Sequence, residues 1–314
     1  MTQPEIVSMG EPMLEFNAEE EGALSEAGRF IVGWGGDTSN FCIAASRAGA
    51  WVGYLTRLGD DEFGDSFLKL WQREGIDTSR VVKDPDAFTA AYFISRKGGQ
   101  HHFTYFRRDS AASRMTPSFL PRDYIADAKL LHVSGISQAI SLGACDTVFA
   151  AMAMAKAAGR LVSYDPNFRP KLWPLDRARA VIHETCRQAD LILPSLDDAR
   201  QLTGLAASEE IARFYLAFGP KVVVIKLGSE GALLATADGL SMFPPYPVDP
   251  IDMSGAGDTF DGAFVASFIA GRPVYECMRF ANAAAAITTT GLGCVTPVPR
   301  REEIEALMAR PSKA

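Results

Sequence analysis

Asp252-Met-Ser-Gly-Ala-Gly-Asp-Thr-Phe260 carries the strongest structural signal in the chain. Its small residues, Gly255 to Gly257, lead directly into the carboxylate of Asp258 and then into a pattern in which phenylalanine recurs every four residues, at Phe260, Phe264 and Phe268. That spacing predicts a helix with the three rings on one face, ending near Gly271. The free N–H groups and the positive dipole at its start would bind a phosphate, with Asp258 placed to accept a hydroxyl proton.

A simpler interpretation of this turn is also open. A carboxylate in the first turn of a helix suits the helix dipole without taking part in any chemistry. The same dipole is expected to lower the pKa of Asp258, which would make it a weak base. Phosphoryl transfer tolerates a weak base, because its loose transition state needs mainly positioning and charge stabilisation.

The composition is that of an ordinary soluble enzyme. The 314 residues are 47% hydrophobic and 22% charged, which predicts one large α/β domain over residues 1–314. Lys and Arg number 31 against 38 Asp and Glu, a net charge of −7, so neither nucleic acid nor a membrane is an expected partner. The five cysteines have no paired short spacing and no signal peptide is evident, so we expect reduced thiols, no metal site and a cytoplasmic protein.

An early turn offers a second candidate ligand site. A short strand at residues 30–33 leads to Gly35-Gly36-Asp37-Thr38-Ser39-Asn40, and a helix is predicted from about Asp37 to Ala48. Paired glycines at a strand-to-helix junction let a ligand reach the backbone, and short polar side chains follow them. The hydroxyls of a small molecule would suit this place, whereas the alternative is an ordinary turn with an N-cap.

The alternation in residues 88–106 predicts a β-hairpin, which does not belong in a parallel repeat. With strands expected near Met13 and Phe30, it predicts a small sheet from residues 12–34 and 88–108, folded over one end of the main domain as a lid. Arg107 follows the hairpin beside aromatic residues. Its planar guanidinium would suit a carboxylate, although a solvated surface charge is the usual alternative.

The rest of the chain alternates strands and helices, which predicts a doubly wound, mostly parallel sheet with helices on both faces. The predicted strands lie at residues 130–133, 161–164, 191–193 and 222–225, and the helices at 142–158, 175–188 and 209–218. Ligands should collect at the carboxyl ends of such strands. Polar residues occupy those ends, at Asp165–Arg169, Ser195–Asp198 and Lys226–Gly231.

Together these motifs resemble the ribokinase-like (PfkB) sugar kinases over essentially the whole chain. In that family an early Gly-Gly turn with a following Asn binds the sugar, which matches Gly35, Gly36 and Asn40. A late Gly-Ala-Gly-Asp stretch holds the phosphates and supplies the catalytic base, which matches Gly255, Ala256, Gly257 and Asp258. The resemblance implies a ribokinase-like fold and an ATP-dependent sugar kinase, with Mg²⁺ carried on the ATP. It leaves open whether a monovalent cation is also required.

Within the family, the chain is most similar to 2-keto-3-deoxygluconate kinases, chiefly through Tyr105-x-Arg107. The substrate contacts that this similarity implies are Gly35, Gly36, Asp37, Thr38, Ser39, Asn40, Tyr92, Tyr105, Arg107, Arg169 and Asp258. The nucleotide contacts that it implies are Asn167, Arg169, Ser195, Lys226, Gly228, Ser229, Gly231, Gly255, Gly257 and Asn282.

Two positions depart from the family pattern. Ser195 and Asp198 stand where the family has an Asn-x-x-Glu element linked to magnesium and phosphate, which leaves that role open. Met253 stands where a small residue or proline is more usual.

The expected activity is phosphorylation of 2-keto-3-deoxygluconate at its terminal hydroxyl, giving 2-keto-3-deoxy-6-phosphogluconate. The alternatives are a kinase for a neutral sugar such as fructose or ribose, and a non-catalytic sugar-sensing protein on the same fold. A nicotinamide dehydrogenase is excluded, because no Gly-x-Gly-x-x-Gly follows the first strand. Since lid sheets in this family often pair between subunits, we expect a homo-oligomer, specifically a dimer through the lid.

Overall fold

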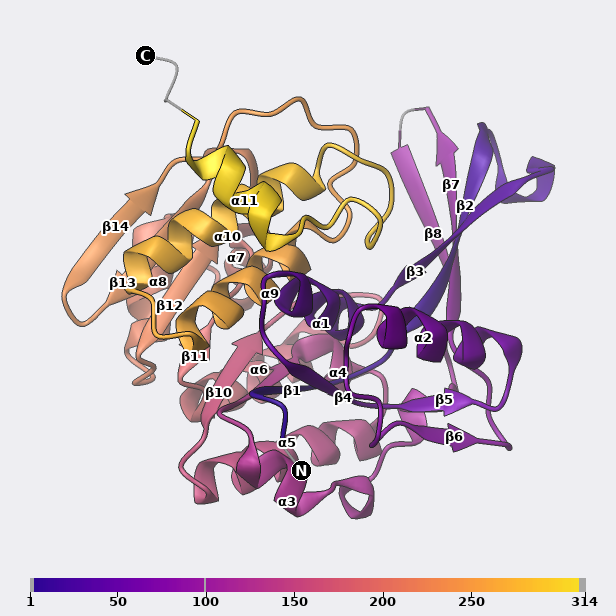
Figure 1. The fold of residues 1–314 in the computed structure, drawn as a ribbon, viewed down its shortest axis with the longest axis horizontal. Helices are drawn as coiled ribbons and strands as arrows, with labels where there is room; N and C mark the ends of the chain where they lie inside the picture. The colour runs from indigo at the N-terminus through magenta and orange to yellow at the C-terminus, as the bar shows by residue number, and fades with distance from the viewer. Residues whose placement is uncertain (1–2, 99, 311–314) are drawn as a thin grey trace.

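The structure, a computed structural model, describes residues 3–98 and 100–310 (Figure 1). At its centre is an eight-stranded sheet with the strand order β14-β13-β12-β11-β10-β9-β1-β4. All pairings from β12 to β4 are parallel, and β13 and β14 extend the sheet by antiparallel pairing. Its strands are β1 (Ile6–Met9), β4 (Val52–Leu55), β9 (Leu130–Ser134), β10 (Leu161–Asp165), β11 (Leu191–Ile192), β12 (Val222–Lys226), β13 (Ala232–Thr236) and β14 (Gly239–Phe243).

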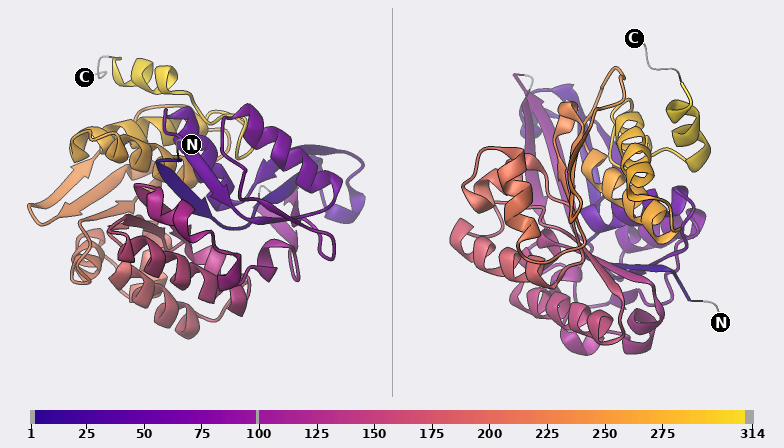
Figure 2. Two further views of the ribbon diagram at one scale, coloured as in Figure 1. Left: turned by 60° about the horizontal axis from the view of Figure 1, so that its bottom comes forward. Right: turned by 90° about the vertical axis from the view of Figure 1, so that its left-hand side faces the viewer.

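Helices cover both faces of this sheet, as Figure 2 shows. One layer contains α1 (Asp37–Arg47), α2 (Glu62–Arg73), α9 (Ala256–Ile269), α10 (Val274–Thr288) and α11 (Arg301–Met308). The other contains α3 (Arg122–Asp127), α4 (Gly135–Ala139), α5 (Leu142–Ala157), α6 (Leu175–Gln188), α7 (Leu196–Thr203) and α8 (Ser208–Leu216). Each layer buries its own apolar cluster against the sheet, so the predicted doubly wound architecture is confirmed.

The helix predicted after the glycine-rich turn is α9. Its three phenylalanine rings lie along one face, with ring centroids 6.2 Å apart for Phe260 and Phe264 and 6.1 Å apart for Phe264 and Phe268. The helix ends at Ile269, and Gly271 follows in the left-handed region at φ +80°. Because α9 packs between α1 and α10, its N-terminus lies beside the N-terminus of α1.

The predicted small sheet is also present. Four strands pair in the order β3-β2-β7-β8, and Figure 1 shows them projecting from the body of the molecule. The strands are β2 (Met13–Glu21), β3 (Phe30–Gly35), β7 (Ala91–Lys97) and β8 (Gln100–Phe106). Side chains alternate between two faces: Phe16, Val32 and Phe93 share one, while Glu15 and Tyr92 share the other with Tyr105. We call these the outer and inner lid faces.

Two strands of the central sheet have no counterpart among the predicted ones. β13 is buried on both faces along most of its length, so it lacks the period-two alternation that marks a half-buried strand. β14 pairs with it across a tight turn to complete the sheet edge. The remaining short elements are β5 (Arg57–Gly59), β6 (Val82–Asp84), and the single-turn helices η1 (Leu24–Glu26), η2 (Ala112–Arg114), η3 (Pro117–Phe119) and η4 (Gly228–Glu230). Among the described residues, no helix is both long and apolar enough to cross a bilayer.

Candidate active site

The two glycine turns predicted as ligand sites meet at the junction of α1 and α9. Asn40, in the first turn of α1, donates a hydrogen bond of 2.8 Å from Nδ2 to Oδ2 of Asp258, in the first turn of α9. These residues are 218 positions apart in the sequence. The pairing of α1 with α9 therefore brings the candidate sugar turn and the candidate phosphate turn into one site.

Glycine is required at the start of each helix. Gly36 precedes α1 at φ +99°, and a Cβ there would lie 2.4 Å from the carbonyl oxygen of Glu11. Gly255 precedes α9 at φ +72°, where a Cβ would lie 2.9 Å from the carbonyl oxygen of Cys294. Gly257, by contrast, is exposed. The backbone at this turn is thus open for an anion to approach.

Thr38 and Ser39 were expected to contact the substrate, but their side chains are buried in the protein. Both are fully buried, because they sit on the face of α1 that packs into the core. The Thr38 hydroxyl is 2.9 Å from the hydroxyl of Tyr54, and Ser39 Oγ accepts a 3.0 Å hydrogen bond from Trp71 Nε1. Their hydroxyls are therefore used inside the protein, and we leave both out of the proposed sugar contacts.

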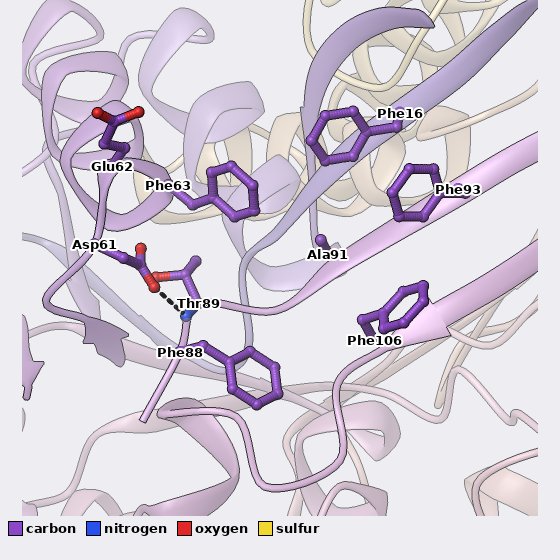
Figure 3. Close-up of a pocket in the computed structure, with 9 residues that line it drawn as sticks. All are labelled: Phe16, Asp61, Glu62, Phe63, Phe88, Thr89, Ala91, Phe93 and Phe106. Carbon is purple, nitrogen blue, oxygen red and sulfur yellow. Dashed lines mark hydrogen bonds between the residues drawn. The ribbon is translucent and has the colours of Figure 1, made fainter. Parts of the chain in front are cut away.

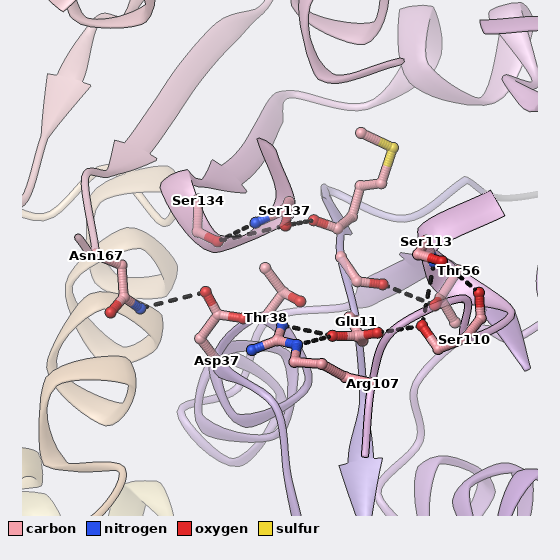
Figure 4. Close-up of polar contacts among 12 residues, drawn as sticks. Glu11, Asp37, Thr38, Thr56, Arg107, Ser110, Ser113, Ser134, Ser137 and Asn167 are labelled. Carbon is pink, nitrogen blue, oxygen red and sulfur yellow. Dashed lines mark hydrogen bonds and ion pairs between the residues drawn. The ribbon is translucent and has the colours of Figure 1, made fainter. Parts of the chain in front are cut away.

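The carboxyl group of Asp258 has a raised pKa. Burial raises its pKa to about 7, the nearby carboxylate of Asp37 adds to the rise, and the hydrogen bond from Asn40 opposes it. The expectation that the helix dipole would lower this pKa is therefore wrong, because desolvation and a like charge outweigh the dipole. Burial also raises the pKa of Asp37, whose Oδ2 accepts a 3.2 Å hydrogen bond from Asn167 Nδ2 (Figure 4).

This pKa gives a testable pH dependence. Asp258 can accept a proton only when ionised, so we expect kcat/KM for the sugar to fall as the pH drops through about 7. A pH–rate profile of kcat/KM, which reports on the free enzyme, measures this fall at low pH directly. A limb near pH 4, the ordinary range of an aspartate, would contradict the assignment.

The predicted strand ends converge behind this turn. Lys226, at the end of β12, is buried, and its Nζ lies 3.1 Å from Asp165 Oδ2 and 2.7 Å from Asp261 Oδ2. These two carboxylates raise the pKa of Lys226 despite its burial. A Cβ on Gly257 would lie 3.7 Å from Nζ, so the ammonium sits directly behind the glycine turn. Asp261 was not predicted, because in the sequence it is only a polar residue in an apolar helix.

Other predicted nucleotide contacts have structural partners of their own. Ser195 caps α7, its Oγ accepting a 3.1 Å hydrogen bond from the backbone N–H of Asp198. Asp198 also lies 3.7 Å from the guanidinium of Arg169. Gly228 and Ser229 form η4, and Gly231 follows it. Asn282 is buried and donates 3.3 Å hydrogen bonds to the carbonyls of Phe243 and Pro244, which anchors the segment after β14.

The inner lid face carries a buried acid that the sequence did not reveal. Tyr92 donates a 2.5 Å hydrogen bond to Oε2 of Glu15, and Cys294 Sγ lies 3.7 Å from the same oxygen. A Cβ on Gly35 would lie 2.5 Å from the Tyr92 hydroxyl, so this side chain reaches the candidate sugar turn. Burial raises the pKa of Glu15. Its partners lie far away in the sequence, which is why no local pattern marks it.

Arg107 was expected to suit a carboxylate, and in the structure its guanidinium is already paired with one inside the protein. Its Nε donates a 2.7 Å hydrogen bond to Oε2 of Glu11, and Nη2 lies 2.5 Å from the same oxygen (Figure 4). Glu11 is completely buried and accepts a further hydrogen bond from the hydroxyl of Ser110. An internal carboxylate thus balances the charge of Arg107, whose guanidinium carbon lies 5.8 Å from the centre of the Tyr105 ring.

Comparison with known proteins covers nearly the whole chain. The model of the pfkB family carbohydrate kinases matches residues 3–301. The chain belongs to this family. It is 34% identical to a 2-dehydro-3-deoxygluconokinase of Bacillus subtilis (97% of this chain, 95% of that protein) and 34% identical to fructokinase-1 of Zea mays (97% and 98%). The crystal structure of a PfkB protein from Polaromonas sp. JS666 superposes with a TM-score of 0.89 at 33% identity, covering 96% of this chain and 99% of that one.

This PfkB protein is therefore a sugar kinase, a phosphotransferase with an alcohol group as acceptor. The resemblance found from the sequence is confirmed, and so is the ribokinase-like fold with its separate small sheet. In the described part of the chain, no group of three or more His, Cys, Asp or Glu side chains is arranged to hold a metal ion. All five cysteines are buried and free.

Proposed function

We propose that this kinase transfers the γ-phosphate of ATP to the terminal hydroxyl of an acidic keto sugar, specifically 2-keto-3-deoxygluconate. The observation that carries the choice of an acidic sugar is the cationic edge of the inner lid face, where the guanidinium carbon of Arg107 lies 5.8 Å from the centre of the Tyr105 ring. Burial raises the pKa of Tyr105, and the positive charges of Arg107 and Arg169 oppose this rise. A sugar carboxylate would add a further negative partner to these two arginines, beside Glu11 and Asp198, whereas a neutral sugar would offer them no charge. Two 2-dehydro-3-deoxygluconokinases, from Bacillus subtilis and Thermoproteus tenax, are each 34% identical to the chain.

In this proposal Asp258 takes the proton of the attacking hydroxyl, and Asn40 holds its carboxylate in position. The backbone N–H groups at the start of α9, from Gly255 to Gly257, stabilise the charge on the transferring phosphoryl group. Gly35, Gly36 and Asp37 contact sugar hydroxyls, with Tyr92 and Tyr105 above them. The positive charge of Lys226, held behind Gly257 by two carboxylates, favours phosphate at this turn.

The nucleotide is assigned by analogy. A fructokinase of Xylella fastidiosa was solved with bound ATP, and one of Vibrio cholerae with fructose, ADP and a calcium ion; each is 25% identical to this chain with a TM-score of 0.86. We propose that ATP lies along the Lys226–Gly231 segment, with its phosphates at α9. Mg²⁺ would arrive on the ATP and neutralise phosphate charge there. We leave a monovalent-cation requirement open.

A kinase for a neutral sugar is the second candidate, because fructokinase-1 of Zea mays matches the chain at the same 34% identity. A coupled assay of ADP release with 2-keto-3-deoxygluconate, fructose and ribose separates the two. We expect the highest kcat/KM with the acidic sugar. A higher value with fructose would make the enzyme a fructokinase, and no turnover with any sugar would leave a sugar-sensing role, against which the intact Gly255–Asp258 turn argues.

We also propose that the protein is a homodimer joined through the outer lid faces. A hollow of about 430 Å³, lined mostly by aromatic side chains, lies between this face and the start of α2 (Figure 3). The aromatic residues that line this hollow are Phe16, Phe63, Phe88, Phe93 and Phe106. Beside it Val32 is 52% exposed, and among the described residues no strand pairs with the outer edges of β3 and β8. A second copy would cover both the apolar face and an open edge.

Changing Val32 to Glu should convert this dimer to a monomer, because each interface would bury two unpaired carboxylates. Light scattering at micromolar concentration should give about twice the 33.9 kDa chain mass for the wild type and a single chain mass for the variant. Leu142→Glu is the matched control, since Leu142 is equally apolar and exposed but lies at the start of α5. A monomeric wild type, or a dimeric Val32→Glu, would refute pairing through this face.

A further inference from the structure

Tyr105 lies on the inner lid face, near the candidate sugar turn. It lies directly opposite Tyr92 in the β7–β8 ladder, so both rings point to the inner lid face. Their ring centroids are 5.8 Å apart. Since the Tyr92 hydroxyl reaches Gly35, the neighbouring ring of Tyr105, which is partly exposed, lies near the same turn, at the edge of the proposed sugar cleft.

Two cations lie over this ring, and they come from different parts of the molecule. Arg107 follows β8 at the base of the lid, with its guanidinium carbon 5.8 Å from the ring centre. Lys171 belongs to the loop after β10, in the body of the protein, with its Nζ 6.0 Å from the ring centre. Tyr105 therefore links lid and body through a cation–π contact at the edge of the cleft.

The two cations differ in how their charge is balanced. The charge of Arg107 is balanced by the buried carboxylate of Glu11. Arg169 lies 3.7 Å from Asp198. Among the residues that the structure describes, no carboxylate lies within ion-pair distance of Lys171, whose side chain is exposed. Lys171 therefore supplies a positive charge beside the lid that no carboxylate of the described residues balances.

We propose that Lys171 binds the carboxylate of the acidic sugar and thereby adds to the preference for an acidic over a neutral substrate. The inference rests on the proposed function, and it assigns part of the charge recognition to an ammonium that no motif pointed to. The ring of Tyr105 holds this ammonium at the cleft before substrate arrives. A flexible four-carbon stem then lets Nζ move to the carboxylate, where the two opposite charges are shielded from water beneath the lid.

The test compares Lys171→Met, Lys171→Arg and wild type with 2-keto-3-deoxygluconate and with fructose. Lys171→Met should lose about 10- to 100-fold in kcat/KM for the acidic sugar, mainly through KM, and less than about three-fold for fructose. Lys171→Arg should keep most of the wild-type preference, because the charge remains. The KM of the wild type for the acidic sugar should rise with ionic strength more steeply than that of Lys171→Met.

Lys129→Met is the matched control, because it also removes one exposed ammonium. Lys129 lies just before β9, at the amino ends of the parallel strands and away from the candidate site, so the change should leave both sugars unaffected. Equal losses with both sugars would mean that Lys171 only holds the lid against the body of the protein, and they would overturn the inference. Wild-type kinetics of Lys171→Met with the acidic sugar would overturn it as well, while leaving the proposed function standing. The wild type alone tests the proposed function. If it phosphorylates no acidic sugar, the proposed function fails and this inference fails with it.

Discussion

Replacing Asp258 with Asn should lower kcat by roughly 100-fold or more while leaving the affinity for ATP nearly unchanged. The amide keeps the shape of the side chain and can still pair with Asn40, but it cannot accept the proton of the attacking hydroxyl. What the variant loses is therefore the proton transfer in the transition state, and not the binding of either substrate.

Steady-state kinetics with ATP and sugar varied separately measure both quantities. The fall of kcat/KM near pH 7 should also vanish in Asp258→Asn, because the group that titrates has been removed. Asp238→Asn is the control, since Asp238 is exposed in the turn between β13 and β14, which lies beside the amino end of β12 and so at the opposite sheet edge from Lys226. Near-normal turnover in Asp258→Asn would assign the base to another residue.

Replacing Arg107 with Met should lower kcat/KM for the acidic sugar by about 30-fold to several thousand-fold, which corresponds to about 2 to 5 kcal/mol. The guanidinium contributes positive charge and further N–H donors at the lid edge, beside Tyr105. The loss toward fructose should be much smaller. Equal losses with both sugars would mean that Arg107 only shapes the lid, and no loss with either would remove a main support of the acidic-sugar proposal.

Glu11 makes a second measurement necessary for this variant. Without Arg107, the completely buried Glu11 carboxylate keeps the hydroxyl of Ser110 as its one side-chain partner among residues 3–98 and 100–310. Leaving a buried charge unpaired costs about 3 to 5 kcal/mol in the free energy of unfolding. Denaturant unfolding should therefore show Arg107→Met to be strongly destabilised.

The double variant Glu11→Gln with Arg107→Met separates stability from recognition. It removes both charges, so most of the unfolding free energy should return, while the preference for the acidic sugar should stay reduced. If instead the double variant recovers the wild-type sugar preference, the effect of Arg107 came from lid stability alone.

Much of the site could be predicted because its backbone parts have local signatures. The turn Gly255–Asp258 and the turn Gly35–Asn40 were both placed correctly at helix starts, since small residues followed by polar side chains and helical periodicity are short-range patterns. The lid was predicted for a similar reason, because its hairpin interrupts the alternation of strands and helices. Strand β13 was not predicted, because its burial on both faces removes the alternation that marks a half-buried strand.

The sequence by itself determined most of the alternating strands and helices, the family and the two turns that form the site, because the motifs behind them are patterns of residues within a few positions of one another. Only the tertiary structure decided which charges meet. Glu11 is 96 positions from Arg107, and Asn40 is 218 positions from Asp258. The pKa of Asp258 likewise depends on burial and on a carboxylate from another helix, so a local argument from the helix dipole gave the wrong sign. Ion pairs and desolvation act through space, and only the packing of α1, α9 and the lid fixes those distances.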